Sequence, residues 1–373
     1  MGLSGGGDSL ALTLIADAWA REAGRELVIL TVDHGLQAES VSWTRSCAAT
    51  AARLGRPFRA LHWTGDKPDA GLPAAARLAR HRLLADAARE AGALVILLAH
   101  TADDLAESAA MRAAGATTPD PRVWSPSPVW PEGRGLFLLR PLLGARRAEL
   151  REFLAAGGET WIDDPANNDP RYARSRVRLA GAALVAPAEP EPPLPLAEQA
   201  VERAGVVAVS RIAFQAAPAS DAHRFVALAA VCAGGGERLP ASARVARAAA
   251  ALRREKPFVA TLVGARIEGD ATTIRVFREP GEAARGGLAP LRPPGVWDGR
   301  FEIADGPEVR RLAGLTRRLP LAQQEMVRTL PAAARGALPA HVNEEGAVTL
   351  GRLDSLVGAR LRAAAGLVQR EPD

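Results

Sequence analysis

The segment Ser4-Gly5-Gly6-Gly7-Asp8-Ser9 stands near the start of the chain, and an apolar pattern with helical spacing follows it at once. Three consecutive glycines allow the backbone to turn tightly and to approach a ligand closely. A helix that begins at such a turn points its unpaired N–H groups and the positive end of its dipole toward the turn. The segment therefore predicts an anion site, and a phosphate fits it. The segment is not the nucleotide-binding loop that ends in Gly-Lys-Ser/Thr, because no lysine follows the glycines. The alternative interpretation is a plain glycine turn before a helix.

Strands and helices alternate over residues 9–150. The predicted elements are a strand at 27–32, a helix at about 39–54, a strand at 58–63, a helix at about 74–91, a strand at 94–99 and a helix from about 102. Such alternation implies a parallel sheet with right-handed crossovers, whose ligands sit beyond the C-terminal ends of the strands. A further strand is expected before Ser4, yet only three residues precede it. We therefore expect the natural start of the protein to lie upstream of Met1, which mass spectrometry of the native N-terminus would test.

A proline-rich stretch interrupts this alternation at residues 115–135. Its prolines exclude a regular helix, and a loop of this length in a compact domain is usually functional or mobile. A surface insertion is the simpler interpretation. A strand is predicted at 136–143, and a charged helix follows at about 146–156.

The second half of the chain gives weaker signals. Residues 186–195 contain five prolines and are typical of a linker. The elements predicted beyond it are helices through about 197–254 and short strands at 258–263, 272–277 and 297–303. We therefore expect an α/β parallel-sheet domain at 1–180, a linker at 181–196 and a smaller helical or α+β domain at 197–373.

Bulk composition limits the classes of protein to which the chain can belong. The 373 residues carry a formal net charge of +5, which permits a polyanionic partner without requiring one. Cys47 and Cys232 are far apart in the sequence, so neither structural disulfides nor a zinc or iron–sulfur site is expected. The sequence shows no apolar run of membrane-spanning length and no signal-peptide pattern. We expect a cytoplasmic protein.

Two polar side chains follow the first buried strand. Asp33 could hold a metal ion or an amine, and His34 could donate a hydrogen bond to a phosphate. An Asx turn closed by Gly35 would explain Asp33 without any ligand.

The second buried strand is followed by His100 and by the start of a helix. Asp104 and Glu107 are three residues apart, so they share one face of this helix and could bind a cationic amine or Mg²⁺. The alternative for Asp104 is a capping box with Thr101, which would leave Glu107 unexplained.

Arginines with helical spacing form two further groups. Arg77 and Arg80 are three apart and could clamp a phosphate or carboxylate with two hydrogen bonds each. Arg171, Arg174 and Arg178 would form one basic stripe on a helix. Surface salt bridges are the ordinary explanation of the first group taken by itself, and a solvated helix face is the alternative for the second.

The glycine segment and the motifs that contain these acidic and basic residues, taken in their order along the chain, resemble the tRNA(Ile)-lysidine synthetase family. This family belongs to the N-type ATP pyrophosphatases, which have an adenine nucleotide alpha hydrolase-like fold. The family motifs are Ser-Gly-Gly-x-Asp-Ser, Val-Asp-His-Gly-Leu, Ala-Arg-x-x-Arg-Tyr, Gly-His-x-x-x-Asp-x-x-Glu-Thr, Arg-Pro-Leu-Leu and Asp-Pro-x-Asn with trailing arginines. The match covers roughly residues 2–178 at family spacing, and 261–264, 278–280 and 297–301 resemble its C-terminal region less specifically. His81 replaces the family's tyrosine, Ala99 its glycine and Ser108 its threonine, and the proline-rich 115–130 stretch replaces a glycine-serine stretch.

The resemblance implies an ATP-dependent ligation of L-lysine to C2 of the wobble cytidine in tRNA(Ile) with a CAU anticodon. The carbonyl oxygen at C2 would attack the α-phosphate of ATP and release pyrophosphate. The ε-amine of lysine would then attack C2 and displace AMP, which leaves lysidine. The implied cofactors are ATP and Mg²⁺, and the implied partners are this tRNA and L-lysine. The oligomeric state stays open, a homodimer included.

The resemblance also implies residue roles. ATP phosphates would contact Ser4, Gly5, Gly6, Gly7, Asp8 and Ser9. Lysine or the metal ion would face Asp33, Asp104 and Glu107, with Asp33 or Asp104 as the candidate Mg²⁺ ligand. Arg77 would neutralise charge at the adenylylated intermediate, supported by His34, Arg80 and His100. Phosphates of the tRNA would contact Arg140, Arg174, Arg176 and Arg178.

Two other classes of function remain open. A different PP-loop enzyme is one, but a thiolase would need paired cysteines and an amidotransferase-type ligase an ammonia-delivering module, and the sequence suggests neither. The other is a non-catalytic nucleotide- or RNA-binding protein, which would not need an intact loop together with Asp33, Asp104 and Glu107. ATP–pyrophosphate exchange that depends on tRNA would separate an enzyme from a binding protein.

Overall fold

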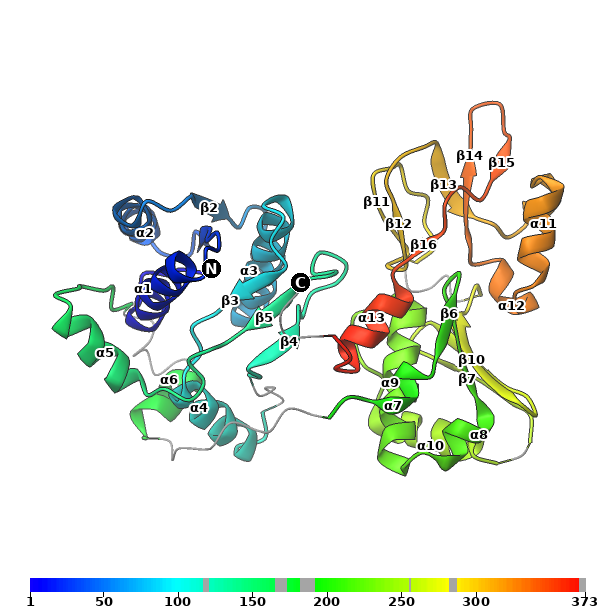
Figure 1. Cartoon of the computed structure of the whole chain (residues 1–373), viewed down its shortest axis with the longest axis horizontal. Helices are drawn as coiled ribbons and strands as arrows, with labels where there is room; N and C mark the ends of the chain where they lie inside the picture. The colour runs from blue at the N-terminus through cyan, green and yellow to red at the C-terminus, as the bar shows by residue number, and fades with distance from the viewer. Residues whose placement is uncertain (117–120, 165–172, 182–191, 255, 282–286, 369–373) are drawn as a thin grey trace. The chain divides into compact units, whose positions relative to one another are not determined.

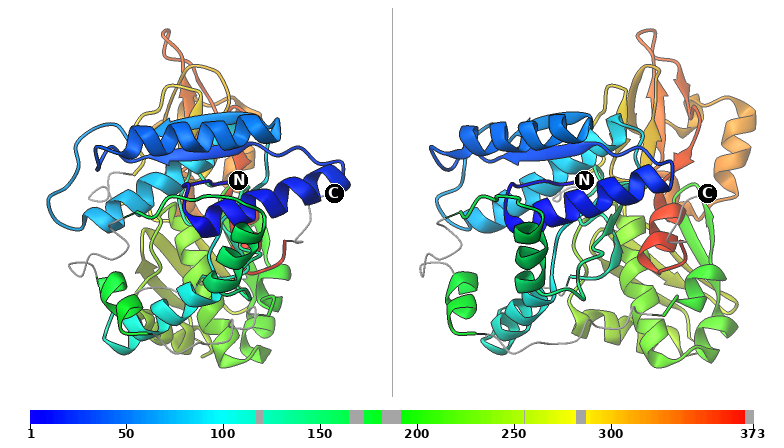
Figure 2. Two further views of the ribbon diagram at one scale, coloured as in Figure 1. Left: turned by 90° about the vertical axis from the view of Figure 1, so that its left-hand side faces the viewer. Right: turned by 60° about the vertical axis from the view of Figure 1, so that its left-hand side comes forward.

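The computed structural model describes residues 1–373 except 117–120, 165–172, 182–191, 255, 282–286 and 369–373. The chain divides into two compact units, Met1–Pro190 and Glu191–Glu371, and each has hydrophobic cores of its own. Figure 1 labels most of the elements of both units, and Figure 2 gives two further views of them. The proposed linker at 181–196 lies mostly outside the described residues, so its bounds stay a prediction.

The first unit alternates helices and strands. Its elements are α1 (Gly7–Glu22), β1 (Ile29–Asp33), α2 (Ser40–Leu54), β2 (Phe58–His62), α3 (Leu72–Glu90), β3 (Val95–Leu97), α4 (Ala102–Ala113), β4 (Trp124–Pro126), β5 (Phe137–Leu139), α5 (Arg147–Ala156) and α6 (Ala173–Leu179). The predicted α/β class is confirmed.

Residues 1–3 join two pairs of parallel strands into one sheet. β1 pairs with β2, and β3 pairs with β5, in both cases in parallel. Between them, the Leu3 N–H donates to the Leu30 carbonyl at 2.8 Å and the Gly2 N–H donates to the Leu97 carbonyl at 3.1 Å. The Gly2–Leu30 bridge is also parallel. The glycine turn therefore follows the central segment of the sheet at its carboxyl edge, where Asp33 and His100 also follow their strands.

Helices cover both faces of this sheet, as the apolar runs predict. Leu30, Ile96 and Leu138 share a core with Leu84 of α3. Residues adjacent to these in two of the strands face the other way: Ile29 packs with Cys47 of α2, and Leu97 packs against the core of α1 and α5. Alternate side chains of each buried strand thus enter different cores.

Part of the proline-rich stretch is an ordered strand, so the prediction of a loop over 115–135 is wrong for β4. β4 pairs antiparallel with β5 at the edge of the sheet. The Trp124 ring stacks on Phe137 with centroids 4.8 Å apart, and Val129 is buried. Pro126 is tolerated because an edge strand does not need every N–H for the ladder.

The second unit combines an antiparallel sheet with two cores. Its elements are α7 (Pro195–Glu198), β6 (Val201–Arg203), β7 (Val206–Ser210), α8 (Arg211–Ala216), α9 (Ala219–Gly234), α10 (Ser242–Leu252), β8 (Phe258–Leu262), β9 (Ala265–Gly269), β10 (Thr273–Arg278), β11 (Gly295–Trp297), β12 (Phe301–Ile303), β13 (Glu308–Arg311), η3 (Thr316–Arg318), α11 (Leu321–Arg328), α12 (Ala332–Arg335), β14 (Pro339–Val342), β15 (Val348–Thr349), β16 (Asp354–Ser355) and α13 (Val357–Ala364). One core lies between the sheet β6-β7-β10-β9-β8 and helices α9, α10 and α13, and the other lies under the later short strands.

Two hairpins in this unit contradict the sequence prediction. Residues 201–210 form β6 and β7 rather than helix, and β9 was not predicted. Each hairpin turns through two residues with positive φ, Ala204 (50°) and Gly205 (81°) in one and Val263 (43°) and Gly264 (84°) in the other. Such turns are normally signalled by Asn-Gly or Asp-Gly. Ala and Val at the first position hide that signal.

Among the helices that the structure describes, none combines the length and the apolar character that crossing a membrane requires.

Candidate active site

The glycine turn is held by its own serines. The Ser9 hydroxyl donates to the Gly6 carbonyl at 2.9 Å and accepts from the Ser4 N–H at 3.2 Å, and the two serine hydroxyls are 3.0 Å apart. Gly5 has a φ of +84°, which favours glycine. α1 begins at Gly7, so the first N–H groups of this helix lack helical partners at the turn. This geometry suits an anion at the turn.

A later segment of the chain lies against this turn. The Ile162 N–H donates to the Gly5 carbonyl at 3.0 Å, and a Cβ at Gly5 would clash with the Ile162 side chain. A Cβ at Gly7 would lie 3.5 Å from the Trp161 ring. The sequence did not predict that this segment contacts the glycines.

Arg147 connects the turn to the acidic residues of α4. Its Nε donates to Asp8 Oδ2 at 3.0 Å and its Nη1 donates to Glu107 Oε1 at 3.2 Å. Its Nη2 lies 3.7 Å from Asp104 Oδ1. Burial acts to lower the pKa of Arg147, but the carboxylates of Asp8, Asp104 and Glu107 raise it above its usual value. Asp8 of the predicted loop and two of the three predicted acids, Asp104 and Glu107, therefore meet around one guanidinium that was not predicted from the sequence.

The carboxylates around Arg147 have further partners. Asp104 Oδ2 accepts from the Thr101 N–H at 2.8 Å and from the Thr101 hydroxyl at 2.9 Å, so the capping box that was an alternative for Asp104 is present. Glu107, only 2% exposed, accepts from Arg178 Nε at 2.8 Å and from Arg178 Nη2 at 3.3 Å. Burial raises the pKa of Asp8, although Arg147 opposes this shift.

Asp33 and His34 form a second group at the same edge of the sheet. Asp33 Oδ1 accepts from the Gly35 N–H at 2.8 Å, so the Asx turn is present, and Oδ2 lies 3.6 Å from His62 Nδ1. Burial acts to raise the pKa of Asp33, but the Gly35 N–H, the Ser40 hydroxyl and His62 bring it below its usual value. Burial, together with Arg80, lowers the pKa of His34, so this imidazole is neutral at pH 7.

A basic cluster surrounds His81. We use this name for Arg77, Arg80, His81, His100 and Arg140. Burial, together with the neighbouring Arg80, Arg77, Arg140 and His100, lowers the pKa of His81 to about 3. Burial, then Arg77 and Arg80, lower the pKa of Arg140 to about 10. Cations gathered so closely favour an anion nearby.

Arg140 has a structural role that the sequence did not predict. It is 5% exposed, and its Nη1 donates to the Arg122 carbonyl at 2.7 Å and to the Ser125 hydroxyl at 3.1 Å. It therefore holds β4 and the residues before it. The predicted contact of Arg140 with tRNA stays a prediction.

The predicted tRNA arginines of α6 differ in their surroundings. Arg178 pairs with Glu107, while Arg176 is exposed. The side chain of Arg174 and all of Arg171 lie outside the described residues. Arg178 is thus part of the acidic site in this structure, and the phosphate contacts proposed for α6 are not tested.

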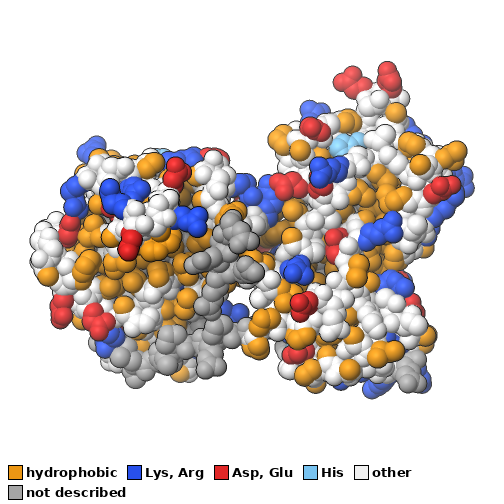
Figure 3. All heavy atoms as spheres, viewed as in Figure 1, with side chains coloured by type: hydrophobic (Ala, Val, Ile, Leu, Met, Phe, Trp, Pro, Cys, Tyr) orange, Lys and Arg blue, Asp and Glu red, His pale blue; other side chains and the backbone are white. Residues whose placement is uncertain are grey.

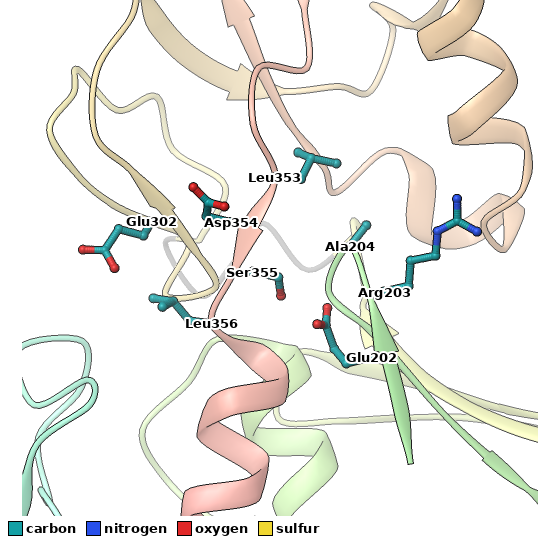
Figure 4. Close-up of a pocket in the computed structure, with 8 residues that line it drawn as sticks. All are labelled: Glu202, Arg203, Ala204, Glu302, Leu353, Asp354, Ser355 and Leu356. Atoms are coloured by element: carbon teal, nitrogen blue, oxygen red, sulfur yellow. The ribbon is translucent and has the colours of Figure 1, made fainter. Parts of the chain in front are cut away.

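A hollow in the second unit contains none of these predicted residues. Figure 4 shows its lining, which includes Glu202, Glu302, Asp354 and Ser355, and its volume is about 510 Å³. The Glu202 carboxylate accepts from the Gly205 N–H at 2.6 Å, so it supports the β6–β7 turn.

One signal for Arg147 does exist in the sequence. It occupies the first position of α5, where the helix dipole disfavours a cation. Paired arginines at a helix start imply acidic partners elsewhere, but the sequence does not say which: Asp8 is 139 residues away and Glu107 is 40 residues away.

A glycine turn that leads into a helix at the carboxyl edge of a parallel sheet, with acids and a basic cluster beside it, defines an ATP-splitting enzyme of the PP-loop class. The family model described as the PP-loop domain matches residues 1–182. The tRNA(Ile)-lysidine synthase of Caulobacter vibrioides is 47% identical over 393 aligned residues, which cover 100% of this chain and 94% of that protein. This chain belongs to the tRNA(Ile)-lysidine synthase family.

Other relatives carry the same name. The tRNA(Ile)-lysidine synthase of Rhizobium meliloti is 34% identical over 85% of this chain and 75% of its own length. That of Ruegeria pomeroyi is 36% identical over 83% of this chain and 76% of its own length. A solved structure, the U34-tRNA thiolase of Methanococcus maripaludis, is similar with a TM-score of 0.40 and 17% identity, covering 48% of this chain and 62% of that chain.

Proposed function

We propose that this enzyme ligates the ε-amine of L-lysine to C2 of the wobble cytidine of tRNA(Ile), with ATP converted to AMP and pyrophosphate. The observation that supports this proposal most directly is the Arg147 bridge, which links Asp8 of the glycine turn to Asp104 and Glu107 at 3.0–3.7 Å. An enzyme that activates a base with ATP and then adds an amine needs a phosphate site and an amine site side by side. The bridge brings one candidate for each together.

The glycine turn would hold the phosphates of ATP. Its serine hydroxyls and the first N–H groups of α1 would bind the leaving pyrophosphate, which lowers the barrier by neutralising charge rather than by covalent chemistry. The Asp33 donor set suits Mg²⁺, because this ion takes one or two carboxylates together with phosphate oxygens. Asp104 is the other candidate, and each of the two carboxylates already accepts hydrogen bonds, Asp33 from Gly35 and Asp104 from Thr101. Bound Mg²⁺ would supply charge neutralisation at the phosphates.

The acids of α4 would hold lysine. An ammonium group needs carboxylates close by, and Asp104 and Glu107 project from one face at the start of this helix. The attacking ε-amine must be uncharged, so the acids would serve the α-ammonium or would position the ε-amine before it loses its proton.

The basic cluster would serve the adenylylated base. Arg77 and Arg80 lie near enough to Arg140 to lower its pKa, so an anion placed among these three cations would reduce their mutual repulsion. The AMP phosphate of the intermediate is such an anion. The base itself would have to leave its stack, so we infer a single-stranded anticodon loop as the target.

We further infer a cytoplasmic enzyme whose tRNA contacts extend to the second unit, and a homodimer as the assembly to test.

Nucleoside analysis tests the proposed function. The purified protein is incubated with ATP, Mg²⁺, labelled lysine and total tRNA, and the digested tRNA is separated into nucleosides. We expect label in lysidine only when ATP is present, together with tRNA-dependent ATP–pyrophosphate exchange. Exchange without lysidine would indicate another PP-loop enzyme, and the absence of both would indicate a binding protein.

A further inference from the structure

The Arg147 guanidinium divides its three nitrogens among three carboxylates. Nε faces Asp8, Nη1 faces Glu107 and Nη2 faces Asp104, at 3.0, 3.2 and 3.7 Å. Asp8 belongs to the first turn of α1, and the other two belong to α4. The Arg147 side chain is 17% exposed. One partly buried cation thus serves both the phosphate side and the acid side of the site.

The two α4 oxygens that face Arg147 are the ones an incoming ammonium would need. Asp104 Oδ2 is committed to Thr101 and Glu107 Oε2 to Arg178 Nη2, at 2.8 and 3.3 Å. Of the other two oxygens, Asp104 Oδ1 faces Arg147 Nη2, while Glu107 Oε1 accepts from Arg147 Nη1 at 3.2 Å and also from Arg178 Nε at 2.8 Å. An ammonium and a guanidinium cannot occupy the same space between these oxygens. Lysine can therefore reach them only after Arg147 has turned away.

ATP offers Arg147 a better partner. Phosphates at the start of α1 would lie next to Asp8, and a guanidinium binds phosphate through two parallel hydrogen bonds. The backbone of Arg147 need not move, since its N–H is anchored to Asp103 Oδ2 at 2.8 Å. Rotation of the side chain toward the phosphates would leave Asp104 and Glu107 with Arg178 as their neighbouring guanidinium, and hence with a net negative charge.

We propose that Arg147 makes lysine binding depend on bound nucleotide: it occupies the lysine carboxylates in the free enzyme and releases them when phosphates fill the glycine turn. This inference rests on the proposed function. It adds an order of events, because lysine that bound first would meet a site already filled by Arg147. Arg147 acts here as a positioning residue, through Asp104 and Glu107.

Equilibrium binding of labelled L-lysine tests this dependence. Lysine affinity is measured for the enzyme with unmodified tRNA(Ile) and Mg²⁺, with and without α,β-methylene-ATP, whose α–β linkage cannot be split. We expect the analogue to tighten lysine binding by about 10-fold in the wild type, within the usual range of coupling between two ligand sites. In Arg147→Gln the two affinities should agree within about 2-fold, which falls below that range.

A neighbouring arginine provides the matched control. Arg146 is 43% exposed and its Nη2 lies 3.5 Å from Asp103, so Arg146→Gln should keep the full effect of the analogue. If Arg147→Gln does not fold, Arg147→Lys takes its place. Lysine keeps the positive charge but lacks the three guanidinium nitrogens that contact the three carboxylates, so the analogue should change lysine affinity less in this variant than in the wild type.

The outcomes separate this inference from the function on which it rests. Equal lysine affinity with and without the analogue in a wild type that makes lysidine would overturn the inference alone, as would full dependence in both Arg147 variants. A wild type that makes no lysidine would overturn the proposed function instead.

Discussion

The two carboxylate oxygens of Asp104 have different environments. Oδ2 accepts two hydrogen bonds from Thr101, and Oδ1 faces Arg147 at 3.7 Å. Asp104→Asn keeps an oxygen for the helix cap but removes the charge. We expect the KM for lysine to rise about 10-fold, which corresponds to about 1.4 kcal/mol, while the KM for ATP stays within about 2-fold. Steady-state kinetics with lysine and ATP varied in turn measures both.

Asp103→Asn is the control for this variant, because Asp103 adjoins Asp104 but faces the Arg147 N–H and Arg146. Its lysine KM should stay close to that of the wild type. An unchanged lysine KM in Asp104→Asn would remove Asp104 from lysine binding and leave it with the helix cap alone.

His81 makes stability depend on pH. Burial and the neighbouring arginines lower its pKa from 6.5 to about 3. Between these two pH values His81 binds a proton in the unfolded chain but not in the folded chain. The free energy of unfolding is therefore highest above pH 6.5, where His81 is neutral in both states, and it decreases as the pH falls toward 3. At pH 5 the loss is about 2 kcal/mol, or about 4–8 °C in the unfolding midpoint of a unit of this size.

The variant His81→Tyr, which restores the residue of the resemblance motif, should remove this contribution. Thermal unfolding at pH 7.5 and pH 5 should show a smaller drop in midpoint for the variant than for the wild type. Equal drops in the two proteins would show that His81 does not remain neutral in the fold.

Single residues could be interpreted from the sequence where their contacts are local. The Asx turn at Asp33 and the cap at Asp104 were both among the alternatives, because each joins residues two or three positions apart. The bridge at Arg147 could not be, since its partners depend on how the sheet brings α1, α4 and α5 together. The same holds for Ile162 and Gly5, which only the folded chain makes neighbours.

At the scale of elements, a buried ion cluster links strands of the second unit. The Asp298 carboxylate accepts from Arg278 Nε at 3.0 Å and from Arg300 Nε at 2.7 Å, and all three side chains are at most 3% exposed. Its Oδ1 also accepts from the Leu288 N–H at 2.9 Å. These residues belong to the 278–280 and 297–301 stretches whose resemblance was less specific, and their burial gives them a structural role.

Asp298→Ala should destabilise the second unit by about 3–5 kcal/mol, because it leaves two buried guanidinium groups without their carboxylate. The unfolding midpoint should fall by at least about 6 °C. Asp354→Ala, which removes an exposed pair with Arg352, is the control and should change it by about 1–2 °C. A drop no larger than that of the control would contradict the structural role of the cluster.

The prediction of elements succeeded where an apolar pattern repeated over a long segment, and it failed for some short strands. α2 and α3 begin and end close to their predicted bounds and α4 begins where it was predicted, because each is long enough for its apolar pattern to repeat. β6 and β9, with three and five residues, give too few repeats, and their turns lack the expected residue pairs. β4 was missed because proline argues against strands except at a sheet edge, and the sequence does not say which strand is an edge.

At the scale of the whole molecule, charge is spread rather than gathered. The net charge is +5, and on the face shown in Figure 3 the Lys and Arg side chains of each unit are interspersed with acids. Binding of tRNA should therefore rest on a moderate number of phosphate contacts. We expect log Kd to rise with log[salt] with a slope between about 2 and 5, so affinity falls about 16- to 1,000-fold from 50 to 200 mM salt.

The same measurement with tRNA(Met), which shares the CAU anticodon, shows which contacts discriminate. Phosphate contacts position a nucleic acid but do not read its sequence. If discrimination comes from base contacts, the two tRNAs should give the same slope and differ by a constant factor at every salt concentration. A smaller slope for tRNA(Met) would mean instead that it reaches fewer phosphates, so that the enzyme rejects it by shape. Filter binding at four or five salt concentrations distinguishes parallel lines from converging ones.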